Sequence, residues 1–191
     1  MRLEGKSAIG TGGGSGFGAG IARKFAAEGA HVFVVDINEA AAKSVAEEVG
    51  GTAIACDVAN AKSVAALAET VLADSPLDIL VNNAGVTHLP NQLEDVTEED
   101  FDWVYNVNMK SVYLTSKTFI PHFKARKAGV ILNVASTAGV SPRPRLNWYN
   151  ASKGWMITAT KTMAVELAPE GIRVNAINPV AGDTPLLKSF M

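Results

Sequence analysis

The sequence is poor in the residues that bind metals or form disulfides. Cys56 is the only cysteine, and three histidines, His31, His88 and His122, are scattered along the chain. A single cysteine cannot form an intramolecular disulfide or a cysteine metal cluster, and no His-Glu-x-x-His sequence is present. These absences argue against a metal site. We interpret Cys56 as a small buried strand residue rather than a reactive thiol.

The chain also lacks a long apolar run and a strong charge of either sign. It contains no stretch of about 20 apolar residues, and its amino terminus lacks the apolar core of a secretion signal. The formal net charge is −2, which gives no general attraction to nucleic acid or to anionic membranes. Arg143 and Arg145 are too local to change this and indicate an exposed loop. We therefore expect a cytoplasmic enzyme or binding protein with no nucleic-acid or membrane partner.

Apolar runs alternate with helical patterns along the chain. The expected strands are residues 7–11, 31–35, 52–58, 77–81, 130–135 and 172–177. The first expected helix follows the glycines near residue 18, and the others cover about 38–49, 60–74, 97–121 and 149–168. Asn38, Asn60 and Thr97 are candidate caps, and Pro121 should end or kink its helix. The alternation predicts one α/β domain, residues 1–191, with a parallel sheet covered on both faces.

Chemically distinctive segments follow the carboxyl ends of the expected strands. They are residues 12–18, Asp36, Asp57, residues 82–85, Ser136 and residues 179–184. Ligands of open parallel sheets bind beyond the carboxyl ends of the strands. We therefore expect these segments to converge on one crevice.

The first of these segments has glycines spaced Gly12-x-x-x-Gly16-x-Gly18. Between a strand and its helix, such glycines let the backbone approach a pyrophosphate, and the helix amino terminus presents free N–H groups. No lysine stands in the Walker position. A tight loop without a ligand is the simpler alternative.

Asp36 ends the second expected strand. A carboxylate at this place can accept both adenosine ribose hydroxyls and would repel a 2′-phosphate. No cation that could hold such a phosphate stands among Gly13, Gly14, Ser15, Ile37 and Asn38. The sequence therefore favours NAD over NADP, unless Asp36 is only a strand-end turn residue.

Ser136, Tyr149 and Lys153 form the second candidate constellation. Residues four apart on a helix share one face, so the Lys153 ammonium can lie near the Tyr149 oxygen. A nearby cation would lower the tyrosine pKa from about 10 toward neutral, where the phenol could transfer a proton. Ser136 could donate a second hydrogen bond to the same reacting oxygen. A packed ring beside a solvated amine is the commoner meaning of this spacing.

Taken together, these segments resemble the short-chain dehydrogenase/reductase family, in the family's order and over nearly the whole chain. Residues 11–18 resemble its Thr-Gly-x-x-x-Gly-x-Gly cofactor loop, residues 82–85 its Asn-Asn-Ala-Gly motif, and Tyr149 to Lys153 its Tyr-x-x-x-Lys signature. Ser136 lies thirteen residues before the tyrosine, and Asn108 falls where the family has a fourth catalytic residue. The resemblance implies a Rossmann-type doubly wound sheet with strand order 3-2-1-4-5-6.

The resemblance also implies a role for each site residue. Tyr149 would be the general acid in ketone reduction and the base in alcohol oxidation, Lys153 would hold the nicotinamide ribose, and Ser136 would bind the substrate oxygen. Asn108 would support a water-linked proton relay. The implied cofactor-binding residues are Gly12, Ser15, Gly16, Phe17, Gly18, Asp36, Ile37, Asp57, Val58, Asn82, Ala84, Gly85, Tyr149, Lys153, Pro179 and Thr184. Asn108 and Asn82 could instead be structural, and Thr184 could be a helix cap.

The chain departs from the family pattern at three places. Gly10 replaces a β-branched residue in the first strand, and Val180 replaces the glycine that commonly follows the proline at 179. Family members usually continue through a substrate-covering segment and a seventh strand, which the resemblance implies are absent from this chain. We expect Gly10 to weaken packing rather than chemistry and Val180 to alter the conformation of its loop. If the chain is truly truncated, we expect an exposed edge beside the sixth strand and compromised catalysis.

The resemblance leaves several functions open. The first hypothesis is an NAD-dependent oxidoreductase for a secondary alcohol or ketone, including a 3-oxoacyl-carrier-protein reductase. A sugar dehydrogenase resembling glucose 1-dehydrogenases and a catalytically silent NAD-binding sensor or scaffold are the alternatives. The resemblance also implies a homodimer or homotetramer formed through the fourth and fifth helices, with candidate contacts Phe101, Val104, Val107, Val112, Leu114, Trp155, Met156 and Met163.

Overall fold

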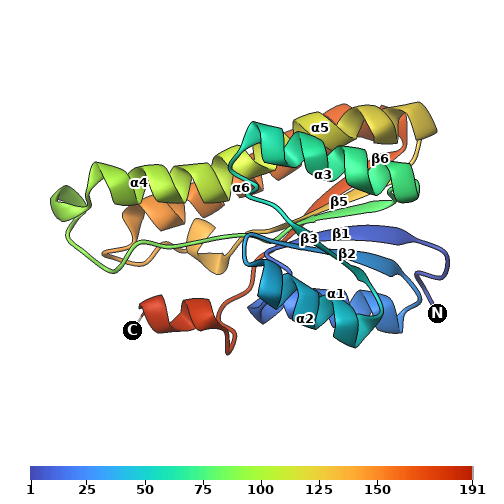
Figure 1. The fold of residues 1–191 in the computed structure, drawn as a ribbon. Coiled ribbons are helices and arrows are strands. Elements are labelled where there is room, and N and C mark those ends of the chain that lie inside the picture. The colour runs from blue at the N-terminus through green and yellow to red at the C-terminus, as the bar shows by residue number, and fades with distance from the viewer. Residues whose placement is uncertain (191) are drawn as a thin grey trace.

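A parallel sheet forms the middle layer of the protein (Figure 1). The computed structural model describes residues 1–190. The six strands are β1 (Ser7–Thr11), β2 (His31–Asp36), β3 (Thr52–Ala55), β4 (Ile79–Asn82), β5 (Gly129–Val134) and β6 (Ile172–Ile177). Every neighbouring pair is parallel and the order is β3-β2-β1-β4-β5-β6. The predicted α/β class and strand order are confirmed.

Helices cover both faces of this sheet (Figure 1). Helices α1 (Gly16–Ala27) and α2 (Glu39–Val49) pack against one face, and α3 (Ala61–Asp74), α5 (Ser111–Arg126) and α6 (Asn147–Leu167) pack against the other. Helix α4 (Glu98–Tyr105) continues into α5 through a π-helical turn, Asn106–Lys110. Short 3-10 turns occupy Leu93–Asp95, Thr137–Gly139, Ala168–Glu170 and Pro185–Phe190.

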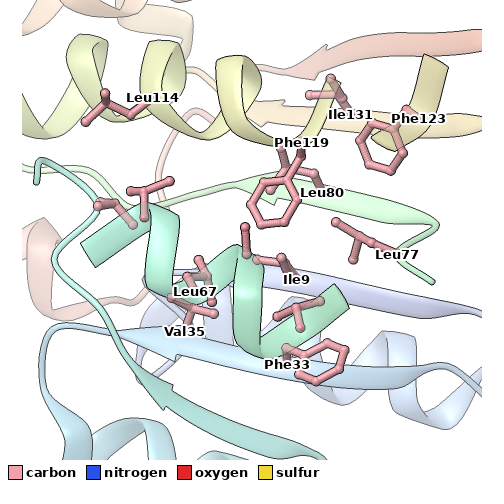
Figure 2. Packing of buried hydrophobic residues seen from close by; sticks show 14 of the residues in the cluster. Ile9, Phe33, Val35, Leu67, Leu77, Leu80, Leu114, Phe119, Phe123 and Ile131 are labelled. Atoms are coloured by element: carbon pink, nitrogen blue, oxygen red, sulfur yellow. The ribbon is translucent and has the colours of Figure 1, made fainter. Parts of the chain in front are cut away.

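The largest hydrophobic cluster lies between the sheet and helices α3, α5 and α6 (Figure 2). Phe119 and Phe123 of α5 are fully buried and point toward Leu80 and Ile131 of the central strands. Side chains alternate along a strand, so Phe33 faces this cluster while its neighbours face α1 and α2. Residues 32–35 of β2 are buried on both faces, which explains why this strand reads as a continuous apolar run.

Asparagine and threonine side chains start three of the helices, as predicted. The Oδ1 atom of Asn38 accepts from the Ala41 N–H at 3.1 Å, and that of Asn60 accepts from the Lys62 N–H at 2.9 Å. The Thr97 hydroxyl accepts from the third N–H of α4. Each side chain satisfies an amide that the helix itself leaves unpaired, which is why these starts could be predicted from the sequence.

Several predicted boundaries were wrong. Strand β3 ends at Ala55, because Asp57 begins a turn in which its own carboxylate accepts the Ala59 N–H. Cys56 is therefore buried but lies just beyond the strand, where burial raises the pKa of its thiol. Helix α6 starts two residues before Tyr149, at Asn147, and β4 starts at Ile79.

Of the two outcomes predicted at Pro121, an end or a kink of the long helix, the end is wrong. Helix α5 continues through Pro121 to Arg126. A proline inside a helix removes one hydrogen bond and crowds the preceding turn, which costs about 3 kcal/mol. Phe119 and Phe123, on either side of it, are completely buried. Burying two such rings contributes more than the proline costs, so packing against the sheet keeps the helix intact.

Candidate active site

A cleft of about 450 Å³ opens beyond the carboxyl ends of the strands. Its walls come from the segments that follow all six strands, so the structure brings the predicted segments together. Three of the predicted site residues, Gly18, Asn82 and Asn108, do not line it. The remaining predicted residues line the cleft: Gly12, Ser15, Gly16, Phe17, Asp36, Ile37, Asp57, Val58, Ala84, Gly85, Ser136, Tyr149, Lys153, Pro179 and Thr184.

The glycine turn brings backbone unusually close to its neighbours. Gly12 and Gly16 have positive φ angles of 61° and 51°, which residues with a Cβ atom rarely adopt. A Cβ on Gly12 would lie 2.9 Å from the Ala84 Cα, and one on Gly18 would lie 1.9 Å from the Gly12 carbonyl oxygen. Gly18 therefore serves close packing of α1 against the glycine turn, while Gly12 lets the β4 loop approach the turn.

The amino terminus of α1 faces this turn. Ser15 is its N-cap residue, but the Ser15 side chain accepts no hydrogen bond from the first turn of the helix. The first helical N–H groups are thus not capped by that side chain, and the helix dipole favours negative charge there. These residues fit a dinucleotide, whose pyrophosphate needs backbone N–H groups at close range.

Asp36 holds a fixed position on the cleft wall. Its Oδ2 atom accepts the Gly14 N–H at 3.0 Å and its Oδ1 atom accepts the Asn38 N–H at 2.9 Å. The two bonds orient the carboxylate at the end of β2, beside the exposed side chain of Ile37. Asp57 lies on the same wall after β3.

Asn82 is part of a buried polar network. Its Nδ2 donates to Asn133 Oδ1 at 2.9 Å, and its Oδ1 accepts from the Thr115 hydroxyl at 2.8 Å. Asn133 in turn donates to Thr160 at 2.8 Å. The network ties β4 to β5 and to helices α5 and α6, so the side chain of Asn82 has a structural role away from the cleft wall.

The next residue, Asn83, lies on the cleft wall and was not among the predicted residues. Its Nδ2 donates to the carbonyl oxygens of Thr11 at 2.8 Å and Gly12 at 3.1 Å. Asn83 therefore clamps the β4 loop onto the glycine turn. The side chains of two adjacent residues at a strand end point to opposite sides. The sequence does not tell which of the two asparagines faces the cleft, and the structure does.

Tyr149 and Lys153 lie one turn apart in α6, next to Ser136 at the end of β5. Both side chains are more than nine-tenths buried, and the Lys153 Nζ atom donates to the Val134 carbonyl oxygen at 2.9 Å. Lys153 Nζ lies 5.9 Å from the centre of the Tyr149 ring. Ser136 caps the following 3-10 turn, with its Oγ atom accepting from the Ala138 N–H.

The electrostatics of this group differ from the sequence-based expectation. Burial raises the pKa of Tyr149 above its ordinary value of 10.0, outweighing the opposite effects of the Ser136 hydrogen bond and the Arg143 charge. Burial also lowers the pKa of Lys153 to about 8. The prediction of a lowered Tyr149 pKa was therefore wrong for the protein alone, because loss of water outweighs the nearby positive charge.

Asn108 lies in the π-helical turn between α4 and α5. Its Oδ1 accepts from the Val86 N–H at 2.8 Å, and its Nδ2 donates to the Val86 carbonyl oxygen at 2.9 Å and to Ser152 Oγ at 3.0 Å. A Cβ placed on Gly85 would lie 3.3 Å from Lys153 Nζ and 3.5 Å from Asn108 Oδ1. The side chains of Asn108 and Lys153 thus both lie next to the Gly85 backbone. The π turn that contains Asn108 is a feature often found at functional sites.

The segment after β6 folds back across the glycine turn. The Pro179 carbonyl oxygen accepts from the Thr137 N–H at 3.1 Å. A Cβ on Gly16 would lie 3.1 Å from Thr184, and a Cβ on Gly182 would clash with the Phe17 ring. These contacts bring the segment after β6 to the cleft, beside Thr137 and the glycine turn.

Two further findings concern metals and membranes. Among residues 1–190, no group of three or more histidine, cysteine, aspartate or glutamate side chains is arranged to hold a metal ion. Within the same residues, no helix combines the length and the apolar composition needed to cross a membrane.

Comparison with known proteins gives consistent relatives. The short chain dehydrogenase family profile matches residues 6–191. The 4-formylbenzenesulfonate dehydrogenase of Comamonas testosteroni is 47% identical over 100% of this chain and 78% of its own length. A 3-ketoacyl-(acyl-carrier-protein) reductase from Brucella melitensis, solved with NADH, is 52% identical with a TM-score of 0.97, over 99% of this chain and 81% of its own.

A solved NAD⁺-bound xylitol dehydrogenase is 33% identical with a TM-score of 0.90, and covers 94% of this chain and 72% of its own. Together with the profile match over nearly the whole chain, these relatives assign the protein an oxidoreductase activity on alcohol or carbonyl groups with a nicotinamide cofactor. The chain belongs to the short chain dehydrogenase family.

Proposed function

We propose that the protein transfers a hydride between NAD and a secondary alcohol or its ketone, with Tyr149 as general acid and base. The observation that carries this proposal is the placement of two groups of residues in one cleft. Ser136, Tyr149 and Lys153 line one part of it, and the glycine turn and Asp36 line another. A bound nicotinamide would supply or accept the hydride, so the protein needs only to position the reactants and move the proton.

The buried side chains would divide the proton chemistry among them. In ketone reduction, the Tyr149 hydroxyl donates its proton to the substrate oxygen, and in alcohol oxidation the phenolate accepts it. The Ser136 hydroxyl holds the same substrate oxygen. Lys153, which lines the cleft beside Tyr149, would hold the nicotinamide ribose. Asn108 would hold the Val86 backbone and Ser152 in place through its three hydrogen bonds.

The cofactor preference in the proposal rests on Asp36. Its carboxylate is held by two backbone N–H groups where an adenosine ribose would lie, and the side chain next to it, Ile37, is uncharged. A 2′-phosphate there would meet a negative charge without a compensating cation. We expect kcat/KM with NAD to exceed that with NADP in the same assay.

The relatives' names support the reaction type and leave the substrate open. One relative is named for a formylbenzenesulfonate, another for a 3-ketoacyl carrier protein and another for xylitol. All three names describe carbonyl or alcohol chemistry. A 3-oxoacyl-carrier-protein reductase and a sugar dehydrogenase are therefore the two finer versions of this proposal, and a panel containing a 3-oxoacyl thioester, polyols and aryl alcohols distinguishes them.

The experiment that tests the proposal replaces Tyr149 by phenylalanine. Turnover of the panel is followed by nicotinamide absorbance, and NAD binding by fluorescence. Loss of a general acid and base lowers rates by about 10²-fold to 10⁴-fold, so Tyr149→Phe should lose turnover while retaining NAD binding. Tyr105→Phe is the matched control, because Tyr105 is exposed on α4 and does not line the cleft. Unchanged turnover in Tyr149→Phe would rule out the proposed proton donor.

A further inference from the structure

Arg143 places a guanidinium group on the wall of the same cleft as Tyr149. Its positive charge lowers the pKa of Tyr149, an effect smaller than the opposite effect of burial. The backbone of Arg143 is also tied to the residue after Tyr149, because the side chain of Asn150 donates to the Arg143 carbonyl oxygen. A ligand whose oxygen reaches Tyr149 therefore comes within the influence of this cation.

The backbone around Arg143 is held in place. The Asn150 Nδ2 atom donates to the Arg143 carbonyl oxygen at 2.7 Å, and the Asn91 N–H donates to the Arg145 carbonyl oxygen at 3.0 Å. Leu146, at the end of the same loop, is buried. The backbone of residues 143–146 is thus held at the start of α6, and Arg143 itself is exposed to solvent.

Arg143 lies away from the acidic residues of the cleft wall. Within the described part of the chain, none of the ion pairs includes Arg143. The acidic residues of the cleft wall, Asp36 and Asp57, follow β2 and β3, whereas Tyr149 stands beside the end of β5. Strands β2 and β5 are three positions apart, which is about 14 Å at the usual spacing between strands. The positive charge of Arg143 is therefore available to a ligand.

Apolar side chains also contribute to the cleft wall. Trp103 of α4, Val107 of the π turn and Leu146 line the same cleft. Apolar and aromatic walls with one placed charge are typical of sites that orient a ligand by a single polar group. A ligand with an apolar body could lie along these side chains between the arginine and Tyr149.

We propose that Arg143 forms an anion subsite, and that the favoured substrate is an alcohol or ketone bearing a carboxylate or another oxyanion on an apolar body. The guanidinium would bind the oxyanion through charge-assisted hydrogen bonds while the reacting oxygen lies at Tyr149. The inference rests on the proposed function, because it takes the substrate oxygen to lie at Tyr149. It goes beyond that function by assigning the charge of the substrate.

The test compares two ligands that differ only in charge, 4-(1-hydroxyethyl)benzoate and its carboxamide. Equilibrium binding of each is measured by calorimetry to the protein with saturating NADH, a state in which the alcohols cannot be oxidised, and to the protein without cofactor. We expect the benzoate to bind at least about fivefold more tightly, because a charge-assisted hydrogen bond at a partly exposed site is worth roughly that factor. Raising the ionic strength should narrow the difference.

Variants assign the preference to one residue. Arg143→Gln should make the two ligands bind equally, and Arg143→Glu should reverse the preference toward the carboxamide. Arg145→Gln is the matched control, since Arg145 lies two positions away in the same loop but does not line the cleft; it should keep the preference. The ratio of kcat/KM for the two ligands should follow the same order. An effect of Arg143 on the proton transfer by Tyr149 would change kcat/KM for both ligands alike, so it cancels in their ratio.

The outcomes separate this inference from the proposed function. A wild-type protein that binds both ligands equally, or neither, overturns the anion subsite, as does a preference that survives in Arg143→Gln. A binding preference that depends on Arg143, without oxidation of any alcohol, supports the subsite and overturns the dehydrogenase function instead.

Discussion

Lys153 carries an electrostatic cost in the folded protein. Its ammonium is almost fully buried and has one hydrogen bond to a carbonyl oxygen, so burial lowers its pKa from 10.5 to about 8. Each pKa unit corresponds to about 1.4 kcal/mol, so the charged lysine destabilises the folded state at neutral pH by about 3 kcal/mol. Such a cost at a buried site is typical of a residue kept for chemistry rather than for folding.

We therefore expect Lys153→Met to raise the free energy of unfolding of the cofactor-free protein by about 1–3 kcal/mol at pH 7, part of the gain being lost with the hydrogen bond to Val134. The same variant should lose turnover.

The pKa of Lys153 is lower in the folded state than in the unfolded state, so the unfolded state binds more protons between about pH 8 and 10.5. The stability of the wild-type protein should therefore rise with pH in this window.

Urea denaturation at several pH values measures this difference. Methionine does not titrate, so the difference in stability between variant and wild type should shrink as pH rises from 8 to 10.5. A constant difference over that range would contradict the assigned cost of the buried ammonium.

At the scale of single elements, β1 and α1 contain glycines with opposite roles. Gly10 lies in the central strand, and a Cβ placed there would meet no atom within 4 Å. A Cβ on Gly18 would lie 1.9 Å from the Gly12 carbonyl oxygen. Gly18 is therefore required by close packing of helix against strand, whereas Gly10, which departs from the family pattern, is not required by space.

We expect Gly10→Ala to stabilise the protein by about 0.4–1 kcal/mol, because alanine has less conformational freedom to lose on folding and fits the strand conformation. Gly18→Ala should destabilise it by more than about 2 kcal/mol through the clash with the glycine turn. Midpoints of urea denaturation with unchanged slopes measure both effects. A destabilised Gly10→Ala would show that the space beside β1 is not open.

At the scale of the whole molecule, aromatic side chains stand exposed on the α4–α5 side. Phe101 stacks on Tyr105 with ring centres 6.4 Å apart, and Tyr113 is half exposed further along. Four of the residues first considered for subunit contacts belong to the protein's own core: Val104, Val112, Leu114 and Met156. The exposed aromatics are thus better candidates for an interface than those buried residues.

We expect sedimentation of the purified protein to give a homodimer or homotetramer, and Tyr113→Glu to shift it toward smaller species, because a charge at an apolar interface is costly to bury. Lys43→Glu, on α2 at the opposite face of the sheet, should leave the mass unchanged. A monomeric wild-type protein would contradict the expected assembly.

Local patterns in the chain were enough to predict the parallel sheet, the three helix caps and the segments that line most of the cleft, whereas the strand order came from the family resemblance. Strand and helix periodicities, caps and glycine turns act over a few residues, and a parallel sheet places every strand end at one edge. The Tyr149 to Lys153 spacing likewise needs only one helical turn. These features follow from neighbours in sequence.

Other features depended on contacts between segments that are far apart in the chain. The continuation of α5 through Pro121 reflects burial of Phe119 and Phe123. Asn82 and Asn83 differ in role because the partner of Asn82 lies on β5 and that of Asn83 lies on β1. The raised pKa of Tyr149 and the place of Arg143 on the cleft wall arise in the same way. Burial and charge proximity are sums over the whole surroundings of a group, so only the folded structure decides them.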